Sequence, residues 1–133
     1  MWLAVWRFQC TTATIRSVKT VLIVDDHLSF RSAARTLLES EGYDVVGEAG
    51  DGAEALELTE RLRPDVVLLD IHLPDMDGFE IAKRLSRNGH GPAIVLTSSR
   101  DAGEFPGLID RSPARGFVPK AELSGRRLAA LLE

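Results

Sequence analysis

The stretch VLIVDD at residues 21–26 decides the fold, because a short aliphatic run ends there in two acids. A run that is apolar throughout, without alternation, is typical of a strand buried on both faces of a parallel sheet. Similar runs recur at residues 66–69 and 93–96, and each is followed at once by a polar side chain. Parallel strands require long crossovers, and the segments between these runs are long enough to hold helices.

These intervening segments have the period of amphipathic helices. Apolar residues at positions 30, 33, 34, 37 and 38 share one helical face, and a capping-box pattern at 51–54 starts a second helix that Pro64 closes. Further helices are expected at 78–85, as a short or irregular piece within 101–110, and from 123 onward; shorter strands are expected at 45–46 and 116–118. The order is (βα)5, which predicts an α/β fold with a doubly wound, open, parallel five-stranded sheet.

Length and composition fit one compact domain. The chain has 133 residues, of which 44% are apolar and 27% charged, and a domain of this size can hold a core without disulfides. Its one cysteine, Cys10, excludes an internal disulfide, and no group of Cys and His residues has zinc-site spacing. The net charge of −4 argues against a dedicated nucleic-acid surface. Because the chain cannot form an internal disulfide, a cytoplasmic protein is expected.

The first twenty residues differ from the rest in charge. They contain three basic residues and no acid, which gives a net charge of +3. The whole chain has a net charge of −4, so the remaining residues carry −7. The apolar opening at residues 2–6 is far shorter than the ~18–20 residues that span a bilayer, and a secretory signal would place its basic residues first. The composition is also that of a transit peptide, but we favour a flexible extension over 1–17 before a domain at 18–133, with no membrane contact.

Five polar side chains fall at the carboxyl ends of the expected strands, where doubly wound sheets bind ligands: Asp25, Asp26, Asp70, Thr97 and Lys120. Each alone has an ordinary structural explanation. Asp26 could cap a helix, Asp70 could start a turn, and Lys120 could be a solvated surface cation. Chance placement of all five at one sheet edge is much less probable than any single coincidence, so we expect a functional site there.

Three carboxylates held together repel one another, which raises their pKa values unless a cation neutralises them. Oxygen ligands from few carboxylates, with room for water and phosphate, suit Mg²⁺ better than zinc or a caged Ca²⁺. With the metal bound, one carboxylate can attack phosphorus while Lys120 balances the anionic product. The residues therefore predict phosphoryl transfer to an aspartate.

Four segments together resemble the receiver domain of bacterial two-component response regulators: VLIVDD at 21–26, LLDIHLPDMDG at 68–78, LTSS at 96–99 and GFVPK at 116–120. The resemblance covers residues 18–133 and is strongest to receivers of regulators that carry a LuxR-type helix-turn-helix domain. It implies a flavodoxin-like fold and a phosphoprotein that takes part in phosphorelay signalling and, in a longer regulator, in control of transcription.

The resemblance also implies a role for each residue at the strand ends. Asp70 would be the phosphoacceptor, charged by a sensor histidine kinase or a small donor such as acetyl phosphate. Asp26 and Asp70 would bind Mg²⁺ through side chains and His72 through its backbone carbonyl, and Asp25 would help directly or through a water molecule. The chain would then be a signalling domain rather than an enzyme, catalysing only its own phosphotransfer and dephosphorylation.

The same resemblance implies a switch. Thr97 and Lys120 would each contact a phosphoryl oxygen, and Phe117 would rotate inward as Thr97 moves. The surface of the fourth helix, fifth strand and fifth helix would respond by forming a homodimer or binding a partner. One departure from the common pattern lies here, because Pro119 precedes Lys120 whereas the family often has a proline after its lysine.

Two other functions compete with this interpretation. Phosphatases of the haloacid-dehalogenase type also use a strand-end aspartate with Mg²⁺, but they need an acid two residues later, where this chain has His72. A phosphate-independent interaction module would not need all five strand-end residues. No DNA-binding element is expected up to Glu133, so the sequence fits both a stand-alone receiver and a piece of a longer regulator.

Overall fold

The computed structural model describes residues 18–132 except 88, 90 and 101, so the extension predicted over 1–17 lies outside the described residues. The elements in chain order are β1 (Thr20–Val24), α1 (Leu28–Ser40), β2 (Asp44–Ala49), α2 (Gly52–Leu62), β3 (Val66–Asp70), α3 (Gly78–Leu85), β4 (Ala93–Ser98), a 3₁₀ turn (Ala102–Glu104), α4 (Leu108–Arg111), β5 (Gly116–Pro119), a second 3₁₀ turn (Lys120–Glu122) and α5 (Gly125–Leu132). The predicted (βα)5 order is confirmed.

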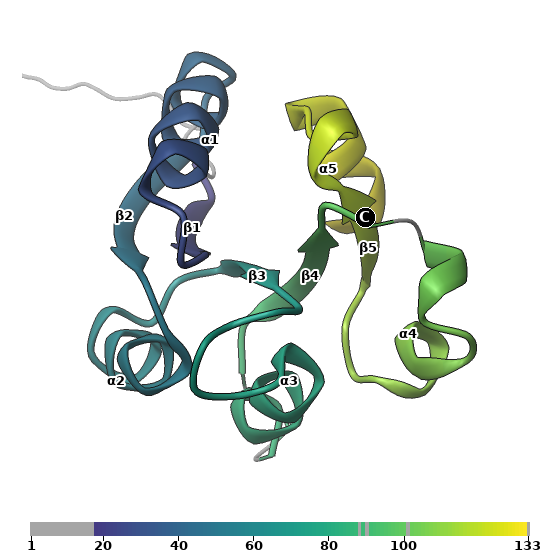
Figure 1. Cartoon of the computed structure of the whole chain (residues 1–133). Coiled ribbons are helices and arrows are strands. Elements are labelled where there is room, and N and C mark those ends of the chain that lie inside the picture. Colours follow the sequence, from purple (N-terminus) through teal and green to yellow (C-terminus); the bar gives the residue numbers. More distant parts are fainter. Residues whose placement is uncertain (1–17, 88, 90, 101, 133) are drawn as a thin grey trace, which may run out of the picture.

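All five strands pair in parallel in the order β2-β1-β3-β4-β5, which Figure 1 shows from one edge of the sheet to the other. The chain winds first from β1 outward to β2, then crosses back to β3 on the other side of β1. The winding therefore reverses between β1 and β3, and this is the place where open α/β sheets form ligand sites at the carboxyl ends of their strands.

Helices cover both faces of the sheet. In Figure 1, α1 and α5 lie above the strands, and α2 and α3 lie below. One core joins Ala34 and Leu38 of α1 and Leu128 of α5 to the sheet, and the other joins Ala55 of α2 and Ile81 of α3 to the opposite face. Each face of the central strands is thereby sealed, which explains why their sequences are apolar throughout.

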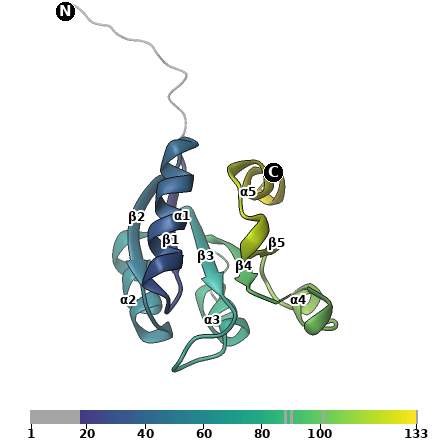
Figure 2. The same cartoon turned by 45° about the horizontal axis from the view of Figure 1, so that its top comes forward.

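The short element α4 lies at the β5 end of the sheet in both views (Figures 1 and 2). The sequence predicted a short or irregular helix within 101–110, and the described part of that segment holds one 3₁₀ turn and then α4. Phe105 lies between these turns with 7% of its surface exposed, and its ring contacts those of Phe79 and Phe117. Phe105, together with the partly buried Ile109 of α4, thus attaches this segment to the core.

Several expected strands are one or two residues longer in the structure, and two further boundaries were wrong for identifiable reasons. The strand expected at 45–46 extends over Asp44–Ala49, because β2 is an edge strand and its polar residues do not interrupt pairing with β1. The last helix begins at Gly125 rather than at Leu123, because a 3₁₀ turn follows β5 and Ser124 Oγ then accepts a hydrogen bond from the Arg127 amide at 3.1 Å.

Within residues 18–132 as described, we find no helix of sufficient length and hydrophobicity to cross a membrane.

Candidate functional site

The carboxyl ends of the central strands bring the predicted acids together. Asp25 directly follows β1, Asp70 is the last residue of β3, and its partner in the β3–β4 register is Thr97. Asp25 and Thr97 are fully buried and Asp70 is 3% exposed, whereas Asp26 is solvent-accessible. The alternative that Asp26 caps the first helix is wrong, since His27 takes the N-cap position of α1 and no side chain caps it.

A fourth potential ligand joins this acidic cluster. One side-chain atom from each of Asp25, Asp26, His27 and Asp70 lies within 4.8 Å of the other three. His27 Nδ1 lies 3.0 Å from Asp26 Oδ1 and 3.2 Å from Asp25 Oδ1, and the His27 amide donates to the latter oxygen at 2.8 Å. Sequence reasoning did not predict a role for His27, although its position immediately after the two acids was a signal.

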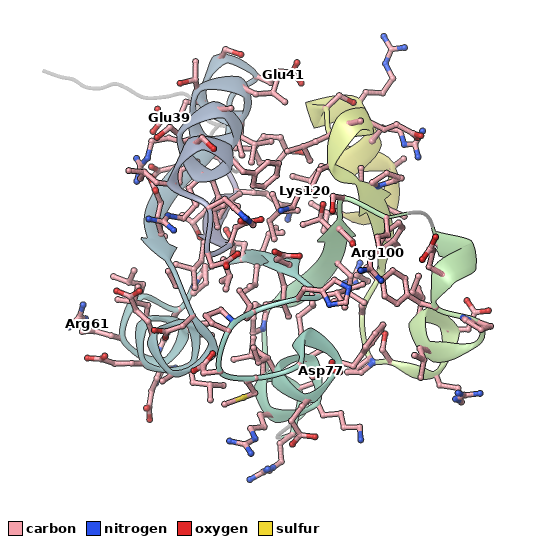
Figure 3. The ribbon with its side chains drawn as sticks, in the orientation of Figure 1. Glu39, Glu41, Arg61, Asp77, Arg100 and Lys120 are labelled. Atoms are coloured by element: carbon pink, nitrogen blue, oxygen red, sulfur yellow. The ribbon has the colours of Figure 1, made fainter. Side chains whose placement is uncertain are left out.

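Lys120 reaches the acidic cluster from the turn after β5. Its Nζ lies 2.5 Å from Asp25 Oδ2 and 3.4 Å from Asp70 Oδ2, and 4.6 Å from the centre of the Phe30 ring. The side chain is only 15% exposed and is labelled between the α1 and α5 ribbons in Figure 3. The alternative that Lys120 is a solvated surface cation is therefore wrong.

The environment of Asp70 shifts its ionisation. Burial raises the pKa of the Asp70 carboxyl, and the nearby Asp25 charge raises it further. Lys120 and the His72 amide, which donates to Asp70 Oδ1 at 3.2 Å, lower this pKa in part. The site therefore holds more negative charge than its single lysine compensates, which favours the binding of an additional cation.

Thr97 and Phe117 are the two residues predicted to form a switch, and their surroundings in the structure differ. Thr97 Oγ1 is buried and has no hydrogen-bond partner among the described residues, which is costly for a hydroxyl group and leaves it free to bind a ligand. Phe117 is half-buried on β5, and its ring centre lies 6.1 Å from that of Phe105. Phe117 thus packs against Phe105, which lies between the first 3₁₀ turn and α4, rather than against the acidic cluster.

The loop after β3 is held close to Asp70. The His72 side chain is exposed, with its ring centre 5.7 Å from that of Phe105, so it lies beside the acidic cluster but is not one of its ligand atoms. Further along, the Asp75 carboxylate accepts hydrogen bonds from the Gly52 and Ala53 amides at 2.7 and 3.0 Å. These bonds lower the pKa of Asp75 and attach the loop to the first turn of α2.

The donor set fits a hard divalent cation. The cluster offers carboxylate oxygens from two strand ends, and the imidazole of His27 is the only nitrogen within it. A site dominated by oxygen suits Mg²⁺ rather than zinc, and the excess negative charge around Asp70 is what such an ion would neutralise. Asp25, Asp26 and Asp70 are the residues that would hold it.

The family was identified by comparison with known proteins. The family model described as "Response regulator receiver domain" matches residues 21–132. The chain belongs to this receiver-domain family. The family resemblance predicted from the sequence is thereby confirmed, together with the flavodoxin-like fold, and the receiver is a module of the kind used in two-component signalling.

Individual relatives agree with this assignment. The transcriptional regulatory protein PdtaR of Mycobacterium tuberculosis is 35% identical over 126 residues, which cover 88% of this chain and 62% of PdtaR. The signal receiver domain of NarL from the same organism is 34% identical, with a TM-score of 0.73 over 88% of this chain and 98% of that one. A LuxR-family two-component response regulator from an Aurantimonas species is 30% identical, with a TM-score of 0.77 over 87% and 86% of the two chains.

The receiver spans only part of its curated relatives. It covers 54% of the length of a putative transcriptional regulator of Pseudomonas aeruginosa and 62% of the length of PdtaR.

Proposed function

We propose that the receiver accepts a phosphoryl group on Asp70 from a sensor histidine kinase, in a reaction that requires Mg²⁺. The observation that carries this proposal is the position of Asp70 at the end of β3, in one cluster with the Asp25 and Asp26 carboxylates, within 3.4 Å of the Lys120 ammonium and opposite Thr97 on β4. Residues 18–133 would form the phosphorylated unit, and the segment 1–17 would be an extension to it.

The transfer needs a carboxylate nucleophile that is ionised although it is buried. An oxygen of Asp70 forms a new bond to phosphorus as the bond from phosphorus to the donor's imidazole nitrogen breaks, and the electron pair of that bond stays on the imidazole. Mg²⁺, when bound, supplies charge neutralisation to the phosphoryl oxygens. Asp25, Asp26 and Asp70 would hold the metal together with the His72 backbone carbonyl, and Lys120 would move from the carboxylates to a phosphoryl oxygen.

Thr97 supplies the link to an output surface. Its hydroxyl group has no partner to give up within the described part of the chain, so a hydrogen bond to a phosphoryl oxygen would be a net gain in the phosphorylated state. Movement of β4 toward the phosphoryl group would change the packing of Phe117 on the neighbouring strand β5. We propose that the α4-β5-α5 surface then forms a homodimer or binds an output partner in the cytoplasm.

Incubation of the purified protein with acetyl phosphate and Mg²⁺ tests this proposal directly. Intact-mass measurement should show one added phosphoryl group that is stable in acid and labile in base. Asp70→Asn should abolish it, and so should removal of Mg²⁺ with EDTA. Asp77→Asn is the matched control, because Asp77 lies on the same loop and asparagine can replace it as the N-cap of α3. A label that persists in Asp70→Asn would refute the assignment.

A further inference from the structure

One half-buried guanidinium group connects the acidic cluster to the rest of the fold. Arg31 lies in the first turns of α1, and its side chain is only 18% exposed. Its Nη1 donates to the backbone carbonyl oxygen of Asp25 at 2.6 Å, and its Nε donates to Glu48 Oε1 on β2 at 3.1 Å. Arg31 therefore joins three elements at the end of the sheet where Asp70 lies.

Glu48 holds this guanidinium in place and is itself held by a second arginine. Arg35, one helical turn further along α1, donates from Nε to Glu48 Oε2 at 2.7 Å. The hydrogen bond from Arg35, supported by that from Arg31, keeps the pKa of Glu48 below its usual value despite burial of the group. Glu48 is thus an ionised anchor whose two oxygens serve two different arginines.

Arg31 contacts the carbonyl of the peptide group that links Asp25 to Asp26. The carbonyl of Asp25 accepts from Arg31, its amide donates to Ala49 O at 3.0 Å, and its carboxylate accepts from the His27 amide. The backbone of Asp25 is therefore held on both sides, and the direction in which Asp26 leaves the strand is set by the peptide that Arg31 holds.

We propose that Arg31 is a positioning residue for the metal site: it orients the Asp25–Asp26 peptide so that both carboxylates face Asp70, and thereby raises the affinity for Mg²⁺. This inference rests on the proposed function, since it assumes that the acidic cluster binds the ion. Partners that orient metal ligands typically contribute about 10- to 100-fold to metal affinity.

Arg35 provides a control that distinguishes the effect of orienting the Asp25 peptide from the effect of losing a positive charge. Both arginines lie on α1 and pair with Glu48, but Arg35 makes its other contacts with Glu39 at 3.2 Å and with the Val45 carbonyl at 3.3 Å, away from Asp25. Glu39 is labelled near the far end of α1 in Figure 3. Loss of Arg35 removes one positive charge and one Glu48 pair but leaves the hydrogen bond to Asp25.

Isothermal titration of the metal-free protein with MgCl₂ tests the inference without any phosphoryl donor. Arg31→Met should bind Mg²⁺ about tenfold more weakly than the wild type. Arg35→Met should stay within about twofold, and Arg31→Lys, whose ammonium can donate to the Asp25 carbonyl, should recover most of the affinity. At saturating Mg²⁺ the rate of labelling by acetyl phosphate should return to the wild-type value in Arg31→Met, because orientation affects binding of the ion rather than Asp70 itself.

The outcomes distinguish this inference from the proposed function. A wild-type protein that binds no Mg²⁺ would overturn both. A wild-type protein that binds Mg²⁺ together with a folded Arg31→Met variant of equal affinity would overturn the inference alone, and so would an equal loss in Arg31→Met and Arg35→Met. Circular dichroism establishes that each variant is folded, and Arg31→Gln replaces Arg31→Met in the titration if the latter does not fold.

Discussion

The Lys120 ammonium should stabilise the metal-free fold strongly, and Lys120→Met tests this. The ammonium lies 2.5 Å from Asp25 Oδ2 and 3.4 Å from Asp70 Oδ2, and both carboxylates are almost fully buried. Removing one partner of a buried ion pair costs about 3–5 kcal/mol, because the remaining charge stays buried without compensation. Methionine keeps the apolar stem of lysine, so little of this cost would come from lost packing.

The expected loss follows from the charge and has a defined pH dependence. The pKa of Asp70 is already raised in the folded state, and loss of Lys120 would raise it further. A carboxyl group whose pKa is higher in the folded state than in the unfolded state binds more protons when folded, so stability decreases as pH rises between the two pKa values. The deficit of Lys120→Met should therefore be larger at about pH 8 than at about pH 5.

Urea unfolding followed by circular dichroism in EDTA measures this deficit. A loss of about 3–5 kcal/mol corresponds to a melting temperature lower by about 10–20 °C for a domain of this size. Millimolar Mg²⁺ should restore more stability to Lys120→Met than it adds to the wild type, because a cation then replaces the lost charge. Lys83→Met, on an exposed position of α3, is the control and should change stability by less than about 0.5 kcal/mol. A deficit below about 1 kcal/mol at pH 8, or one that grows on acidification, would refute the reasoning.

Two further substitutions test local features of the site. Thr97→Val removes a buried hydroxyl group that has no hydrogen-bond partner among the residues that the structure describes. The free energy of unfolding should therefore stay level or rise by about 1 kcal/mol, while labelling by acetyl phosphate slows; clear destabilisation in urea would contradict this. Gly78→Ala would place a Cβ 2.7 Å from both Asp70 O and Ile71 Cα, which are backbone atoms that cannot move aside. It should cost about 1–3 kcal/mol in the same assay, whereas Gly103→Ala, which meets open space, should cost much less; equal effects would count against the close contact.

The central strands and the acids that follow them could be predicted because strands buried on both faces are apolar at every position. Residues 21–24 and 66–69 are apolar without interruption, and parallel pairing then brings Asp25, Asp70 and Thr97 to one edge whatever the details of packing. The edge strand β2 is harder to recognise in the sequence, because only some of its residues are apolar. Its length was therefore underestimated.

Long side chains that act across elements could not be predicted in the same way. Arg31 lies among polar residues of an amphipathic helix, where an arginine is usually solvated. Only the tertiary arrangement brings its guanidinium to the Asp25 carbonyl and to Glu48 on a strand that follows in the chain. Ser124 is a different case, because a serine just before a helical segment is an N-cap signal that would have moved the predicted start of α5 from Leu123 to Gly125.

The way in which Phe105 attaches the 102–111 segment has a consequence for the rate of amide hydrogen exchange. This segment contains one 3₁₀ turn and one α-helical turn. Phe105 is its only buried hydrophobic residue among those described, and Ile109 packs against the same core but is only partly buried. Few backbone hydrogen bonds, one buried side chain and one partly buried side chain resist its opening, so its amides should exchange through a local event well below the free energy of global unfolding. A surface that opens so readily can be rearranged by a ligand that contributes only a small difference in binding energy between the two states.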